Sequence, residues 1–197
     1  MVRLRWASMI ATLSVITLAA TTQSLAQVTK TVITIDLLNG MLNDRPIFSW
    51  TLDEVTDLLG RPSAVENPVG GIVGARLHYH ETGLSLWFEA PQKDPRQAVF
   101  ILSIYLSKAW DVRNRNHFLP FRGTLVPAVD ANWKANQILK ELASFNPTVE
   151  TPEERRRKAG VPVPMPEELI RMRRDVYQVN FVIEPNTKFV ERVNITR

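Results

Sequence analysis

Residues 50–62 read WTLDEVTDLLGRP and contain both the start and the end of one amphipathic helix. Thr51 and Glu54 have the spacing of a capping box, in which each side chain accepts a hydrogen bond from the backbone N–H of the other residue. Apolar residues recur three and four positions apart, which gives the helix one apolar side. Gly60 followed by Arg61-Pro62 ends it, because glycine adopts the left-handed C-terminal conformation and proline cannot continue a helix. The stretch predicts a helix packed on a sheet.

Three strands are predicted after this helix, as an antiparallel meander. The alternating segments run over 76–80, 84–89 and 99–107, and sequential strands pair most simply with their neighbours. Alternation places one set of side chains on an apolar face that covers the helix. This set is Leu77, Tyr79, Leu84, Leu86, Phe88, Phe100, Leu102, Ile104 and Leu106. We therefore predict an α+β fold with an antiparallel sheet packed on helices.

The second half of the chain repeats the first at a shift of 83 residues. The shift matches Gly40 with Gly123, Leu42 with Leu125, Trp50 with Trp133, Val55 with Ile138 and Leu59 with Leu142. We interpret this match as an internal duplication that produced two related units in tandem. The second unit is expected to contain a helix over 132–143, a short helix over 167–174 that starts after Pro166, and closing strands over 176–183 and 189–195.

The N-terminal residues 1–26 have the pattern of a secretory signal peptide. Arg3 and Arg5 precede an apolar stretch of 15 residues, and Ser24-Leu25-Ala26 offers small residues to a signal peptidase. The stretch is shorter than the about 20 residues that span a bilayer. We expect cleavage after residue 26, a periplasmic or secreted protein, and no stable membrane insertion.

The domain organisation follows from these patterns. The first unit is expected over 27–112 and the second, degenerate unit over 113–197. The second unit carries an insertion over 145–166 that holds five of the 13 prolines and is predicted to be a stiff loop.

Composition excludes several classes of protein. The chain has no cysteine, which excludes disulfide scaffolds, thiolate zinc sites, cysteine nucleophiles and a lipoprotein anchor. Lys and Arg number 24 and Asp and Glu 20, so the chain is nearly neutral once the two signal-peptide arginines are removed. Nucleic acid is not an expected partner, because its recognition needs a concentrated basic face. The basic runs 155–158 and 171–174 follow glutamates at the four-residue spacing of ion pairs on solvated helices.

The sheet face opposite the core is the predicted binding surface. It presents Arg76, His78, His80, Trp87 and Tyr105, and aromatic side chains among charged ones are typical of protein-binding hot spots. The two histidines have a spacing that metal sites use, but the sequence offers no third ligand in a fixed geometry, so no metal is expected. The same pattern also fits a face covered by the second unit, with the tryptophan as core between the units.

Motifs of catalysis and cofactor binding are missing from the sequence. No serine lies in a G-x-S-x-G or S-x-x-K motif, and the glycines of 68–74 lack the setting of a phosphate or dinucleotide loop. We therefore expect no catalytic residues, no cofactor and no enzyme activity. A pair of carboxylates in a cell-wall hydrolase remains an alternative, because their separation in space is not visible in a sequence.

Residues 50–62, followed by the strand that begins Arg76-Leu77-His78-Tyr79, resemble the small helix-plus-meander domain of the SmpA/OmlA (BamE) envelope proteins. They are also similar to the beta-lactamase inhibitor proteins, whose tandem units present a sheet face to an enzyme. The resemblance covers roughly Gly40–Leu106 and returns from Gly123. OmlA-type proteins are lipoproteins, whereas this chain has no cysteine to lipidate.

The resemblance implies a protein without enzymatic activity that binds another envelope protein. An inhibitor or immunity-type protein that neutralises a cell-envelope toxin or enzyme is the expected form. The alternative is a soluble structural factor of envelope or secretion machinery.

Overall fold

The computed structural model describes residues 32–67, 73–91, 93–159 and 167–197. Residues Thr31–Arg197 group into one compact unit, and the description below is of that unit. The predicted signal peptide lies outside the described residues. The fold is α+β, as predicted. Within the described ranges, no helix is both long and apolar enough to cross a membrane.

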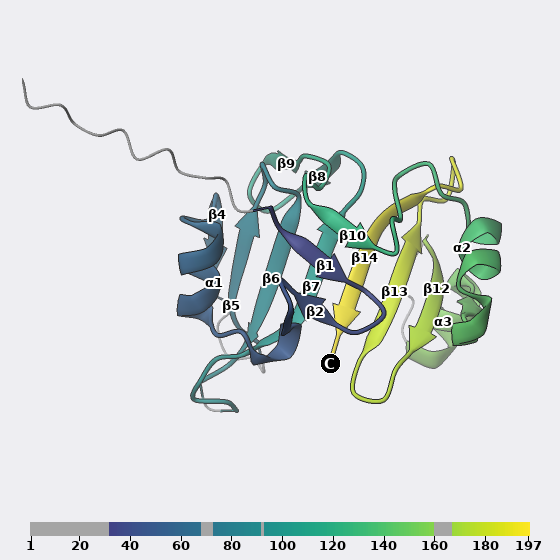
Figure 1. Ribbon diagram of the computed structural model, residues 1–197. Coiled ribbons are helices and arrows are strands. Elements are labelled where there is room, and N and C mark those ends of the chain that lie inside the picture. Colours follow the sequence, from purple (N-terminus) through teal and green to yellow (C-terminus); the bar gives the residue numbers. More distant parts are fainter. Residues whose placement is uncertain (1–31, 68–72, 92, 160–166) are drawn as a thin grey trace, which may run out of the picture. The chain divides into compact units, whose positions relative to one another are not determined.

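The main sheet has eight strands, all paired antiparallel (Figure 1). Their spatial order is β11 (Thr148–Glu150), β12 (Glu168–Arg173), β13 (Gln178–Ile183), β14 (Val190–Thr196), β7 (Val99–Tyr105), β6 (Leu84–Glu89), β5 (Val73–Tyr79) and β4 (Ala64–Glu66). The predicted meander is confirmed as β5, β6 and β7, and the predicted closing strands are β13 and β14. The central β7/β14 pairing joins the two predicted units in a single sheet.

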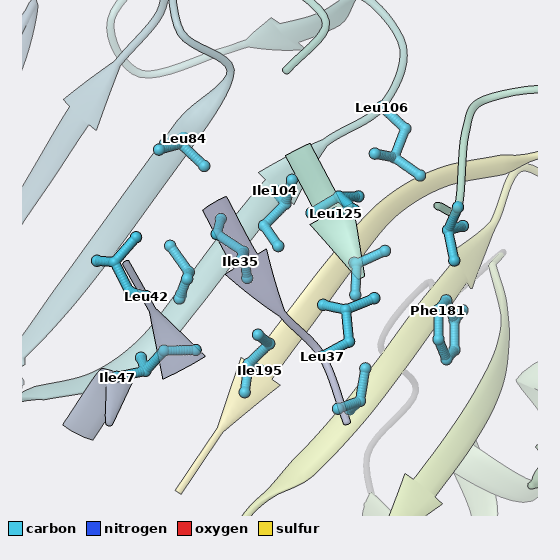
Figure 2. Packing of buried hydrophobic residues seen from close by; sticks show 14 of the residues in the cluster. Ile35, Leu37, Leu42, Ile47, Leu84, Ile104, Leu106, Leu125, Phe181 and Ile195 are labelled. Carbon is cyan, nitrogen blue, oxygen red and sulfur yellow. The ribbon is translucent and has the colours of Figure 1, made fainter. Parts of the chain in front are cut away.

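A small sheet lies across the apolar face of the main sheet (Figure 1). It contains β10 (Thr124–Val126), β1 (Thr34–Asp36), β2 (Met41–Leu42) and β3 (Arg45–Pro46), and β1 runs parallel to β10. Figure 2 shows Ile35 and Leu125 of this small sheet facing Ile104 and Ile195 of the main sheet. Burying these apolar side chains against one another is the main force that holds the two layers together.

The helices complete the core. Helix α1 (Leu52–Leu59) begins at Thr51 with both hydrogen bonds of the predicted capping box and buries Val55. Helix α2 (Ala135–Glu141), at the place of the predicted second helix, buries Ile138. Short 3₁₀ turns, η1 (Ile47–Ser49) and η2 (Ala143–Phe145), lie before α1 and after α2. Helix α3 (Pro152–Ala159) is made almost entirely of charged residues, so it has no apolar side to contribute to the core.

The two halves of the main sheet match in register. Each has a β-bulge at the same distance from the centre, with the extra residue Phe100 of β7 opposite Trp87 and Phe88 and the extra residue Glu191 of β14 opposite Val182 and Ile183. The first half has a further register shift between Val73 and Arg76 of β5. The sequence-matched tryptophans, Trp50 and Trp133, each accept a backbone hydrogen bond of 2.9 Å, from the first residues of β7 and β14 respectively. The matching positions meet at the pair Ser103 and Asn194, where an approximate two-fold axis passes through the sheet. A common origin of the halves stays a prediction.

Three expectations about local structure are wrong. Residues 167–174 form strand β12 and not a helix, because Ile170 and Met172 alternate into the core and two strands flank the segment. The stretch 145–166 is not a loop throughout, since its described part contains β11 and α3. Phe100 leaves the apolar face because it is the extra residue of a bulge in β7, where Val99 pairs with Phe88 and takes the core position.

Candidate functional site

A row of paired residues crosses the main sheet on the face opposite the core. From edge to edge it contains Ala64, His78, Ser85, Ser103, Asn194, Asn180, Arg171 and Thr148. Several of these polar side chains are buried, and only 1% of Ser85 is exposed. Because a buried polar group needs hydrogen-bond partners, this face is not an ordinary solvated surface.

A hairpin covers the first half of this face. It is formed by β8 (Ala109–Asp111) and β9 (Asn116–Phe118). The Phe118 ring stacks on Tyr105 with 3.9 Å between ring centroids, and it meets the edge of His80 at 4.6 Å. Nε2 of His80 lies 3.0 Å from the Asp111 carboxylate. The hairpin is therefore held on the sheet by aromatic stacking and by a buried hydrogen bond.

The chain that leaves the hairpin is fixed at Gly83. Leu119 donates its backbone N–H to the His80 carbonyl at 2.8 Å, and Phe121 donates to the Tyr105 carbonyl at 2.7 Å. Gly83 has a positive φ of 72°, and a Cβ there would clash with the Leu119 carbonyl. Only glycine permits this close approach of two backbones, so the residue positions the hairpin over the sheet.

Glu66, on the edge strand β4, collects donors from both the sheet and the hairpin. Its carboxylate accepts from Arg76 at 3.1 Å, from Arg113 at 3.0 Å and from Asn114 at 3.3 Å. Burial raises the pKa of Glu66, but the hydrogen bond and positive charge of Arg113 and the hydrogen bond of Arg76 act against it, and the pKa lies below its usual value. The hairpin is thus tied to the edge of the sheet by an ionised carboxylate.

Burial lowers the pKa of His78, although Glu66 and Asp111 oppose the shift. The imidazole is therefore neutral at pH 7. Its Nδ1 lies 3.2 Å from the Ser85 hydroxyl, and its Nε2 lies 3.4 Å from the Glu66 carboxylate. Burial also raises the pKa of Asp111, but hydrogen bonds from His80 and Asn114 dominate and lower it to about 2.

Ser85, His78 and Glu66 are the residue types of a hydrolytic triad, but here they act as structural support. In the second half the matching positions are Asn180, Arg171 and Glu150, which form the same chain of contacts at 3.2 and 2.6 Å without any nucleophile. Ser85 is buried, whereas a nucleophile must reach its substrate. The contacts of the second half satisfy polar groups buried on the sheet, whereas in the first half Nε2 of His78 makes no hydrogen bond.

The structure changes the interpretation of the predicted site residues. His78 and His80 are 7% and 3% exposed, so the expectation of an open face is wrong for both. The reason is the hairpin over 109–118, which the sequence did not place. Tyr105 is largely covered by Phe118.

Arg76 and Trp87 remain at the opening beside the hairpin. The guanidinium of Arg76 lies 3.9 Å from the Trp87 ring centroid. Trp87 is half-buried, so part of the indole stays accessible. Partner binding by these residues stays a prediction.

A pocket of about 270 Å³ lies between this face and the hairpin. Four predicted residues, Arg76, His78, Trp87 and Tyr105, line it. Its lining also contains Glu66, Ala109, Trp110, Asp111, Val112, Arg113, Phe118, Glu191 and Arg192. The sequence interpretation missed the hairpin residues. The alternation of 109–112, with Ala109 and Asp111 turned inward and the two residues between and after them exposed, is the signal that marks them.

A second pocket, of about 490 Å³, lies in the other half of the molecule. Its charged lining residues are Glu150, Glu154, Lys158, Arg171 and Arg173. It has no tryptophan or tyrosine in its lining. Across the residues that the structure describes, no group of three or more His, Asp or Glu side chains is arranged to hold a metal ion.

No family model matches the chain, and no curated protein matches it. Neither comparison supports the resemblance to the SmpA/OmlA or beta-lactamase inhibitor proteins. Among solved structures, the chain is similar to a DUF4309 family protein, YjgB, from Bacillus subtilis subsp. subtilis str. 168. The two are 16% identical, the alignment covers 79% of this chain and 83% of the other, and the TM-score is 0.45. No residue roles follow from this similarity.

Proposed function

We propose that this protein is an exported binding module without enzymatic activity that docks on another protein of the cell envelope. The docking surface is the opening beside the hairpin, where Arg76 stacks on Trp87. An inhibitor or immunity-type protein that neutralises an envelope toxin or enzyme is the form that best fits an export signal and a small prearranged surface. The sequence resemblance to helix-plus-meander binders belongs to this proposal.

The Arg76–Trp87 stack is the observation that carries the proposal. Tryptophan and arginine are the side chains most enriched in binding hot spots. Here the guanidinium is held from both sides, by the Trp87 ring at 3.9 Å and by the Glu66 carboxylate at 3.1 Å. A side chain fixed before binding loses little conformational entropy when a partner arrives. The stack is therefore prearranged to contact a partner.

The second half of the sheet supports this interpretation by contrast. The cross-strand pair Arg76 and Trp87 has Leu169 and Val182 at the matching position. The fold itself therefore does not require an arginine and a tryptophan there. A function specific to the first half explains why these residue types are present.

The test is capture of envelope proteins on the immobilised mature chain, followed by purification of the retained protein and calorimetry. Removing an aromatic hot spot costs about 2 kcal/mol or more, so Trp87→Ala is expected to weaken binding about 30-fold. The matched control is Phe145→Ala, which removes an aromatic ring beneath Arg174 in the second half and leaves binding unchanged.

Three results would contradict the proposal. The wild-type chain retains no protein in stoichiometric amounts, Trp87→Ala binds as well as wild type, or the Phe145 control loses binding equally. Circular dichroism of Trp87→Ala separates loss of binding from loss of the fold. If the variant is unfolded, Arg76→Ala replaces it, because the arginine is not part of the apolar core.

A further inference from the structure

We propose that the outer side of the β8/β9 hairpin docks on an anionic lipid surface. This inference goes beyond the proposed protein partner, and it rests on the exposed side chains of the hairpin and not on Arg76 and Trp87, although Trp110 and Val112 also border the pocket beside these two residues. The hairpin's inner side, with Asp111 and Phe118, is fixed on the sheet. Its outer side exposes two large apolar residues, Trp110 at 53% and Val112 at 75%.

The charge of the hairpin segment favours an anionic partner. The segment from Lys108 to Arg122 carries four cations and one acid. All four cations, at 108, 113, 115 and 122, are exposed, whereas the single acid is buried. Arg113 is paired with Glu66 on the edge of the sheet, so the positive charge of the outer side comes from Lys108, Arg115 and Arg122. That acid, Asp111, already accepts hydrogen bonds from His80 and Asn114. The outer side of the segment is therefore uniformly positive and complements an anionic surface.

The exposed Trp110 favours a lipid surface. Its ring contacts His117 at 4.6 Å on the outer side of the hairpin. Among the exposed large hydrophobic residues of the described chain it is the one aromatic. Tryptophan prefers the boundary between water and lipid, because its indole is apolar yet carries a polar N–H. An exposed tryptophan surrounded by cations is the composition of an interfacial docking element.

The hairpin is short enough to hold its cations close to Trp110. Three residue pairs join β8 to β9, a length of about 10 Å. Lys108 and Arg115 therefore lie within about one Debye length of Trp110 at physiological salt. Each cation held near an anionic bilayer strengthens binding by about fivefold. Two such cations together give about 25-fold, enough for reversible attachment.

A lipid surface suits this hairpin better than a large protein interface. A standard protein interface uses about 20–30 residues on each side, whereas the exposed apolar surface here is two side chains on one small hairpin. A bilayer needs only a local amphipathic contact, and its charge is spread evenly over its surface. Nucleic acid is the competing polyanion and forms one arm of the test.

The test is flotation of the mature chain with vesicles. Vesicles of phosphatidylcholine containing about one third phosphatidylglycerol are compared with pure phosphatidylcholine, at about 0.05 and 0.5 M salt. We expect at least tenfold stronger binding to the anionic vesicles, and loss of that preference at high salt. The double variant Lys108→Glu/Arg115→Glu is expected to weaken binding by more than tenfold, and Trp110→Ala by about tenfold.

The matched control is Arg156→Glu/Arg157→Glu, which makes the same change of net charge at two exposed residues of α3. It is expected to bind within twofold of wild type. Equal loss in this control, equal binding to neutral vesicles, or stronger binding to a DNA duplex than to the anionic vesicles overturns the proposal. Val112→Ser serves as a second apolar variant if Trp110→Ala disturbs the hairpin. Trp87→Ala binds vesicles normally, which separates this proposal from the protein partner.

Discussion

The two halves of the main sheet place a glutamate at the same edge position but surround it differently. In the second half, Glu150 pairs at 2.6 Å with both Lys158 and Arg171, and the Lys158 hydrogen bond is the main cause of its lowered pKa. In the first half, Glu66 pairs with Arg76 and faces a neutral His78 beneath the hairpin. The shared position belongs to the fold, and the different neighbours distinguish the two halves.

On the face opposite the core, the aromatic residues lie in the first half. Arg192 lies 5.6 Å above the Tyr105 ring, just as Arg76 lies above Trp87. The cross-strand pair Arg192 and Tyr105 has Ile101 and Thr196 at the matching position across the central axis. The comparison therefore teaches that these two cation–aromatic stacks on the face opposite the core, and the hairpin above them, are specific to one half and are not required by the sheet. Both proposals concern these features.

The largest expected effect is on stability, at two matching residues of the hydrophobic core. Leu86 and Phe181 are matching, fully buried residues in β6 and β13. Because both lie in one hydrophobic core, Leu86→Ala is expected to cost about 2–5 kcal/mol and Phe181→Ala about 3–5 kcal/mol. Urea unfolding followed by circular dichroism measures both, and each variant is expected to show one transition.

Val65→Ala is the control, since Val65 is largely exposed on the edge strand, and it is expected to change stability by less than about 0.5 kcal/mol. Two separate transitions in either core variant would show that the halves unfold independently. The idea of a single cooperative sheet would then be wrong.

The next effect is smaller and depends on pH. The pKa of His78 in the folded protein lies below its ordinary value of 6.5 because of burial. The unfolded chain then binds more protons, so stability falls as the pH drops below about 6.5, with a slope of at most about 1.4 kcal/mol per pH unit from this group. Glu66 and Asp111 have lowered pKa values, so the stability that they contribute is lost only below about pH 4.

Urea unfolding at several pH values checks this, with His78→Gln as the variant. Between pH 7 and 5 the variant is expected to lose the slope that His78 causes. Arg171→Gln at the matching position of the second half is the control and keeps it, because arginine does not titrate in this range. A slope unchanged in His78→Gln would contradict a neutral, buried imidazole.

The sequence predicted the elements whose signals are local. The capping box of α1, the meander and the closing strands depend on spacing within a few residues, and all are confirmed. Strand β12 was missed because Glu167 and Arg171 have helical spacing, yet Arg171 pairs with Glu150 on the neighbouring strand. No local pattern encodes such a long-range contact.

The candidate site was predicted in part for the same reason. Alternation correctly placed His78 and Trp87 on the face opposite the core, since side-chain direction in a strand is local. It did not predict that His80 is covered, because the cover depends on Phe118 and Asp111, which lie more than 30 residues away along the chain. Whether a sheet face is buried depends on such distant segments. The alternation of residues along one strand does not show whether another segment covers them.

The smallest expected effect concerns the helix starts. Thr51 caps α1 with a side-chain hydrogen bond, whereas Lys134, at the matching position before α2, has the same extended backbone and makes no side-chain cap. Thr51→Ala is expected to cost about 1 kcal/mol, because it leaves a helix N–H without a partner. Lys134→Ser is expected to gain about 0.5 kcal/mol, since the new hydroxyl caps α2 but the contact of the lysine with the Phe189 ring is lost.

Thermal unfolding of both variants measures these shifts, and Thr51→Ser, which keeps the hydroxyl, is the control expected to match wild type. The sign at Lys134 is the informative result. A gain in stability means that the start of α2 lacks a cap that the start of α1 has, and that a hydroxyl residue, as at Thr51, supplies it. A loss as large as that of Thr51→Ala means that the Lys134–Phe189 contact has replaced the cap, so that the two halves start their helices by different interactions.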